Sequence, residues 1–139
     1  MPAYSTAVPS LPLGMQDMTF AYDDLMCSGN VAIPHRTDGS GFRYYPLKIS
    51  NKYYNTICAG GINASISDMS IWLKALMGQY PQVLPRQALD SLFQPMVKTT
   101  TDRRYYNYWS GVQDSYYGKG IRILDYGDHY KYYHGGYAN

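Results

Sequence analysis

Apolar residues recur at helical spacing in SISDMSIWLKALMG, residues 65–78. Five of them share one face of a helix: Met69, Trp72, Leu73, Leu76 and Met77. Ser65 or Ser67 is a suitable N-cap, and Asp68 suits the positive end of the helix. Gly78 stands where a helix often ends on a left-handed residue. The pattern therefore predicts a helix over residues 65–78.

A second helix is predicted in LPRQALDSLFQP, residues 84–95. Its apolar residues Leu89, Leu92 and Phe93 fall on one face. Pro85 suits the first turn of this helix, and Pro95 ends it, because proline cannot continue a helical backbone.

The C-terminal stretch has the alternation of a β-hairpin. GKGIRILDY and HYKYYHGG flank Gly127-Asp128, a dipeptide suited to a tight two-residue turn. Ile121 and Ile123 share one face of the first strand, and Tyr130, Tyr132 and His134 share one face of the second.

The first third of the chain is rich in turn-forming residues, and it predicts irregular chain with short extended pieces such as Phe42–Ile49. The glycine pair Gly60-Gly61 predicts close packing of the backbone just before the first helix. Two helices that pack against an antiparallel sheet give an α+β fold class.

Composition narrows the classes of function. The 139 residues suffice for one domain, and a net charge of +2, scattered along the chain, predicts neither a nucleic-acid nor a membrane partner. No apolar run is long enough to span a membrane, and the N-terminal MPAYSTAVPS lacks the basic and apolar regions of a signal peptide. Seventeen tyrosines against three phenylalanines suit partly wet clefts and sheet surfaces.

The cysteines and histidines show no metal-site spacing, so neither a metal nor a cofactor is expected. Free, buried thiols are expected for Cys27 and Cys58, with one disulfide as the alternative.

Four segments occur in an order that resembles a known family: PLGMQDMTF, AGGINASISDMSIWLKALMG, VLPRQALDSLFQP and YGKGIRILDYGDHYKYYHGGYAN. From Leu11 onward the chain resembles the C-terminal part of serine β-lactamases and penicillin-binding proteins, in the class C β-lactamase-related branch that includes esterases and D-aminopeptidases. The resemblance implies a partial β-lactamase/transpeptidase-like fold. It also implies a hydrolase that forms an acyl-enzyme on a β-lactam, an ester or a D-amino-acid peptide.

The resemblance assigns the end of the chain to the family's third motif, a Lys-Thr-Gly or His-x-Gly box on a strand that lines the cleft. His134, Gly135 and Gly136 match this box. By carry-over, His134 would face a substrate carboxylate or the catalytic serine–tyrosine network, and the backbone N–H of Tyr137 would be an oxyanion donor. Histidine in place of lysine makes the charge of the box pH-dependent, which favours an esterase or peptidase.

The family's other catalytic elements have no match here. No serine is followed by lysine three residues later, and Ser70 precedes Lys74 by four positions. The family's tyrosine element precedes PLGM, whereas the three Tyr-x-Asn matches, which begin at Tyr53, Tyr105 and Tyr137, follow it. Residues 1–139 are therefore interpreted as one partial domain, without the nucleophile part and without the last strand and helix. Such a segment is not expected to catalyse acyl transfer alone.

The expected partners are a small-molecule or peptide substrate and either the missing part of the domain or a second copy of the chain. The family implies a periplasmic or secreted location. The alternative hypothesis is a non-catalytic, tyrosine-rich domain that binds a peptide or a glycan.

Overall fold

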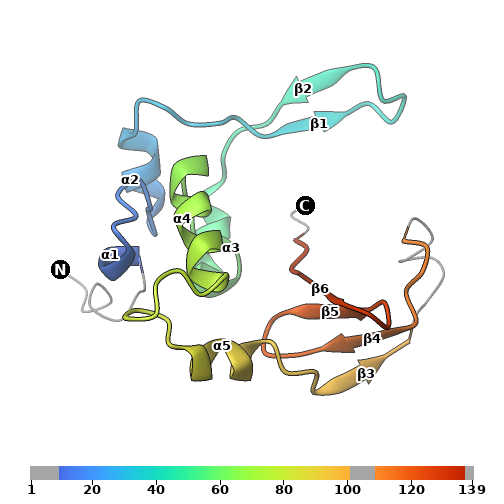
Figure 1. Ribbon diagram of the computed structural model, residues 1–139. Helices are drawn as coiled ribbons and strands as arrows, with labels where there is room; N and C mark the ends of the chain where they lie inside the picture. The colour runs from blue at the N-terminus through green and yellow to red at the C-terminus, as the bar shows by residue number, and fades with distance from the viewer. Residues whose placement is uncertain (1–9, 101–108, 137–139) are drawn as a thin grey trace. The chain divides into compact units, whose positions relative to one another are not determined.

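The computed structural model describes residues 10–100 and 109–136 (Figure 1). The chain forms two compact units, Met1–Leu73 and Lys74–Asn139. The first contains a two-stranded sheet and the second a four-stranded sheet. Helices and antiparallel sheets are both present, which confirms the α+β fold class.

The first unit contains more helix than the sequence predicts. Its elements are α1 (Ser10–Leu13), α2 (Tyr22–Cys27), β1 (His35–Thr37), β2 (Tyr44–Pro46), the 3-10 helix η1 (Asn51–Thr56), α3 (Ile57–Gly60) and most of α4 (Ile66–Leu76). β2 lies inside the extended piece predicted over Phe42–Ile49 and pairs antiparallel with β1. The short helices lack the apolar periodicity that would reveal them in the sequence.

Polar contacts link distant segments of the first unit. Thr19 and Asn63 exchange backbone hydrogen bonds of 3.0 Å, and the Asn63 side-chain amide donates to the Tyr54 hydroxyl at 2.7 Å. The buried Asp68 carboxylate accepts from the backbone N–H of Asp17 at 2.9 Å. Gly61 is also buried, and a Cβ there would lie 2.9 Å from the Cα of Ile57, so the predicted close packing is confirmed at Gly61. A Cβ on Gly60 would lie no closer than 3.8 Å from its neighbour, the Tyr53 carbonyl oxygen.

The ends of α4 follow the sequence prediction. The Ser65 hydroxyl accepts from the backbone N–H of Asp68 at 3.1 Å, which identifies Ser65 as the N-cap. After the helix, Gly78 has a φ of +82° and its N–H donates to the carbonyl of Ala75 at 2.9 Å.

The predicted apolar face of α4 is largely exposed. Met69 is 40% exposed, Leu73 56% and Met77 75%, whereas Ala75 and Asp68 are buried. Helical spacing shows which residues share a face, but it does not show which face the rest of the chain covers.

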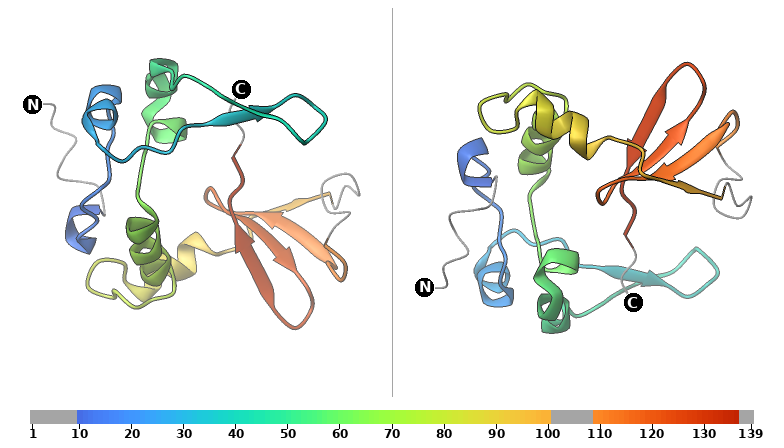
Figure 2. Two further views of the ribbon diagram at one scale, coloured as in Figure 1. Left: turned by 90° about the horizontal axis from the view of Figure 1, so that it is seen from above. Right: turned by 90° about the horizontal axis from the view of Figure 1, so that it is seen from below.

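The second unit contains α5 (Arg86–Leu92), which lies inside the predicted helix; Pro85 is its N-cap, and Leu89 on the predicted apolar face is buried. Four strands follow, in the order β3 (Val97–Thr99), β4 (Asp114–Tyr117), β5 (Arg122–Asp125) and β6 (Tyr130–Tyr133). All are antiparallel, and each strand pairs with its neighbour along the chain (Figure 2). The sequence pattern predicts the β5–β6 hairpin but neither β3 nor β4.

The β5–β6 turn has the predicted two-residue form. Asp125 pairs with Tyr130, and the backbone N–H of Tyr126 donates to the carbonyl of His129 at 3.0 Å. Gly127 therefore occupies the first central position, where its φ of +90° fits a type II′ turn.

The core of the sheet lies at β5, where Ile123 and Leu124 are fully buried on opposite faces. α5 packs on the face of Ile123, because Ile123 pairs with Tyr132 and the Tyr132 ring lies 4.5 Å from that of Phe93. The helix C-terminus approaches the β4–β5 turn so closely that a Cβ on Gly118 would lie 2.9 Å from the Gln94 carbonyl oxygen.

Candidate functional site

His134 is the first residue after β6, the last strand of the sheet. His134, Gly135 and Gly136 are all exposed. These three residues therefore follow directly after a strand, and their role as the box stays a prediction. Tyr137, the predicted oxyanion donor, lies outside the described residues.

The space around the two glycines of the box, Gly135 and Gly136, is empty of other parts of the described chain. A Cβ built on Gly135 or Gly136 would meet no atom of the chain within 4 Å, and neither residue has a positive φ. Neither steric crowding nor left-handed backbone therefore requires glycine at these two positions. Close approach of a ligand stays a prediction.

Aromatic rings line the face of β6 that packs against α5. The Tyr130 and Tyr132 rings lie 6.3 Å apart, and Tyr132 also contacts Phe93. Partial burial, and secondarily the neighbouring Tyr130, raises the pKa of Tyr132. β6 ends at Tyr133, so the structure does not extend this strand face to His134.

The opposite face of β6 carries a second cluster. The Trp109 and Tyr133 rings lie 5.0 Å apart, and the Lys131 ammonium lies 4.6 Å from the centre of the Trp109 ring. A cation over an indole face is an attractive contact. These contacts link Trp109 to β6, the strand that precedes His134.

Among the described strands, β6 pairs only with β5, so its other edge is free. The backbone groups on this edge can pair with another extended segment.

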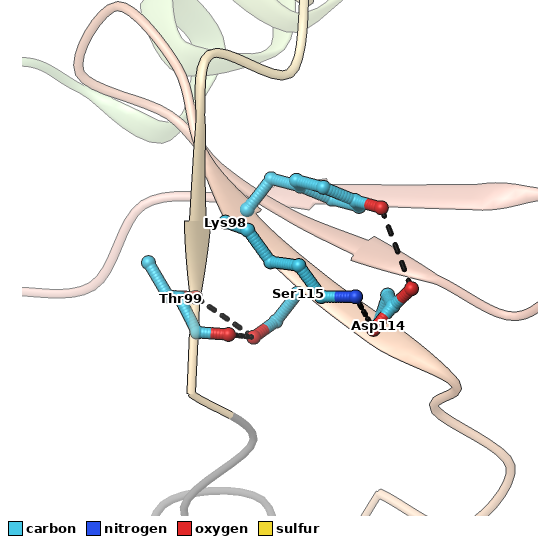
Figure 3. Close-up of polar contacts among 5 residues, drawn as sticks. Lys98, Thr99, Asp114 and Ser115 are labelled. Atoms are coloured by element: carbon cyan, nitrogen blue, oxygen red, sulfur yellow. Dashed lines mark hydrogen bonds and ion pairs between the residues drawn. The ribbon is translucent and has the colours of Figure 1, made fainter.

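Polar side chains that no sequence motif had indicated meet on β3 and β4 (Figure 3). The Lys98 ammonium lies 2.7 Å from the Asp114 carboxylate, and the Tyr116 hydroxyl donates to the same carboxylate at 3.4 Å. The hydrogen bond to Asp114 raises the pKa of Lys98, and desolvation, reinforced by Asp114, raises that of Tyr116. No local spacing signals this cluster, because it depends on the pairing of two strands that were not predicted.

Ser115 lies on the other face of β4 and does not have the surroundings of a nucleophile. Its side chain is fully buried, its hydroxyl donates to the Thr99 carbonyl at 3.1 Å, and the Thr99 hydroxyl lies 2.7 Å away (Figure 3). A nucleophilic serine needs an adjacent base and access to substrate. Ser115 instead links β3 to β4.

Neither Ser70 nor the described Tyr-x-Asn match, which begins at Tyr53, supplies a nucleophile. The Ser70 hydroxyl donates to the carbonyl of Ser67 at 2.7 Å, as a hydroxyl inside a helix often does. Tyr53 lies in η1, and the Tyr-x-Asn matches that begin at Tyr105 and Tyr137 fall outside the described residues.

Cys27 is a free, exposed thiol at the end of α2, so its expected burial is wrong. Within residues 10–100 and 109–136, no three metal-ligating side chains gather into a group that could hold an ion. In the same part of the chain, no helix has the length and apolarity needed to cross a membrane.

Comparison with solved structures finds a similar fold. About 82% of the chain superposes on part of the octameric penicillin-binding protein homologue from Pyrococcus abyssi, with a TM-score of 0.60 and 19% sequence identity. The chain spans 23% of the length of that protein. No family model and no curated protein matches the sequence. At this identity the likeness concerns the fold alone.

Proposed function

We propose that this chain is part of a serine hydrolase domain of the penicillin-binding-protein type, and that it contributes one wall of the cleft. The observation that carries the proposal is the similarity of its fold to part of a penicillin-binding protein homologue, with His134-Gly135-Gly136 directly after the last strand. The reaction would be acyl transfer from a β-lactam, an ester or a D-amino-acid peptide to a serine.

In this proposal His134 is a hydrogen-bond donor to the substrate, and the two glycines leave room for it beside the backbone. The N–H of Tyr137 stabilises the oxyanion that develops when the serine attacks. The serine and its base belong to another part of the domain, because the sequence has no Ser-x-x-Lys. The free edge of β6 would pair with a further strand of that domain.

No observation favours the tyrosine-rich binding domain as the function. The ring contacts found in the described part of the chain are made between residues of the chain itself.

Acylation with a fluorophosphonate or a labelled penicillin, followed by intact-mass analysis, tests the proposal. The 139-residue chain alone should gain no adduct, whereas the product of the whole reading frame should gain one. In that longer product, His134→Ala should slow acylation by about 10²-fold or more, the usual effect of losing a positioned donor. His134→Lys should restore most of the rate, because lysine also donates.

Two results would contradict the proposal. An adduct on the 139-residue chain would mean that one of its own serines is activated. An unchanged acylation rate of the longer product after His134→Ala would mean that His134 does not take part in the cleft. Tyr44→Phe, at an exposed position of the other unit, is the matched control and should leave the rate unchanged.

A further inference from the structure

The β1–β2 hairpin buries no side chain. Every residue from 32 to 48 is exposed, including Phe42 at 89% and Tyr44 at 67%. The hydrogen bonds at its two ends stay within the hairpin, from the N–H of Asp38 to the Arg43 carbonyl at 3.3 Å and from the N–H of Leu47 to the Pro34 carbonyl at 2.7 Å. An isolated two-stranded hairpin is marginally stable in water. This segment therefore needs a surface to cover it.

The charges of the hairpin indicate the chemistry of that surface. Arg36 and Arg43 are exposed beside its aromatic residues, and Asp38 is its one acidic residue. The Asp38 carboxylate already accepts from the N–H of Ser40 at 2.9 Å. A fitting partner thus offers carboxylates next to apolar side chains.

The same unit presents such a surface on α2. Asp23 and Asp24 in its first turn are exposed, and Met26 is 52% exposed. Within residues 10–100 and 109–136, no ion pair involves these two aspartates or either arginine of the hairpin. Each copy of the chain thus carries both halves of a complementary contact, and neither half is satisfied.

We propose that a second copy of this chain covers the hairpin, with the hairpin of each copy on α2 of the other. In such a two-fold arrangement Arg36 and Arg43 meet the partner's Asp23 and Asp24, and Phe42 packs beside the partner's Met26. Two-fold symmetry makes the contact twice, which doubles the apolar area that it buries. The net charge of +2 is too small to keep two copies apart.

Analytical ultracentrifugation of the 139-residue chain at low salt tests the proposal. The wild-type chain should form a dimer that weakens as salt rises. R36E/R43E and D23K/D24K should each raise the dimer dissociation constant by at least about tenfold, because reversed charges then face like charges. An equimolar mixture of the two variants should recover the dimer, since hairpin and α2 carry opposite charges in both contacts of the mixed dimer.

The mixture also controls for misfolding as the cause of weaker dimerisation, because two unfolded variants would not form a dimer when mixed. R86E/D90R exchanges the charges of a pair on α5 and should leave dimerisation unchanged. A wild-type chain that stays monomeric at all concentrations would overturn the proposal, as would full-strength dimers of R36E/R43E or no recovery in the mixture. This inference does not depend on the proposed hydrolase function, because no step of it involves acylation.

Discussion

Gly118 shows how a single residue couples two elements of the second unit. It follows β4 directly, and its backbone lies against the carbonyl groups at the C-terminal end of α5. Its φ is not in the positive region that favours glycine, so the approach of the two segments, and not local backbone conformation, excludes a side chain here.

Gly118→Ala is expected to destabilise the protein by about 1–3 kcal/mol, the usual cost of overpacking. The added methyl group would lie 2.9 Å from the Gln94 oxygen and 3.3 Å from the Leu92 oxygen, both of which are backbone atoms. Urea unfolding followed by circular dichroism measures the change. Gly29→Ala is the matched control, because a Cβ there meets nothing within 4 Å, and it should stay within about 0.5 kcal/mol of wild type. Equal stability of the two variants would mean that α5 does not approach the turn.

At the scale of elements, the contact between α5 and β6 links the helix to the strand that precedes His134. The Tyr132 ring contacts both the Phe93 ring, at 4.5 Å between centroids, and the Tyr130 ring, at 6.3 Å. Partial burial favours the neutral phenol of Tyr132 and raises its pKa.

This shift predicts a loss of stability at alkaline pH. The unfolded phenol titrates near its ordinary pKa of 10.0, and the folded one at a higher pH. The contribution of Tyr132 is therefore complete below pH 10.0 and is lost as pH rises toward and through the folded pKa. Urea midpoints measured between pH 8 and pH 11 should fall less steeply for Tyr132→Phe than for wild type. Equal slopes would show that this phenol is no more buried in the folded state than in the unfolded one.

The elements also show what a single sequence can predict. The ends of α4 could be predicted because Ser65 caps the helix and Gly78 ends it through contacts within the same short segment. The β5–β6 hairpin could be predicted because the dipeptide Gly127-Asp128 favours a tight turn by itself. β3 was missed because a strand of three residues has too few positions for its alternation to be recognised. The exposure of Leu73 was not predictable, because burial depends on which other segments cover the helix.

The candidate site also has features that the sequence could predict and features that it could not. The sequence pattern placed His134 on one strand face with Tyr130 and Tyr132, whereas β6 ends one residue earlier, at Tyr133. The pairing of Lys98 with Asp114 was not predictable from the sequence, because these residues meet through the register between β3 and β4, and neither strand was predicted.

For the whole molecule, the uneven distribution of buried side chains predicts uneven protection from hydrogen exchange. Ser115, Ile123 and Leu124 on β4 and β5 are fully buried, whereas every residue over 32–48 is exposed. In dilute solution, peptides from β4 and β5 should exchange slowest and peptides from the hairpin fastest. Hydrogen-exchange mass spectrometry measures both. Slow exchange of the hairpin in a chain shown to be monomeric would mean that another segment of the same chain covers it.

The order of the strands has a kinetic consequence. Because β3, β4, β5 and β6 pair strictly in chain order, every strand pairing in this sheet joins consecutive segments. Low contact order of this kind is associated with fast folding, since few distant segments must meet before contacts form. On a ribosome the sheet can assemble strand by strand as the chain emerges, so that the segment carrying His134 joins a scaffold that already exists.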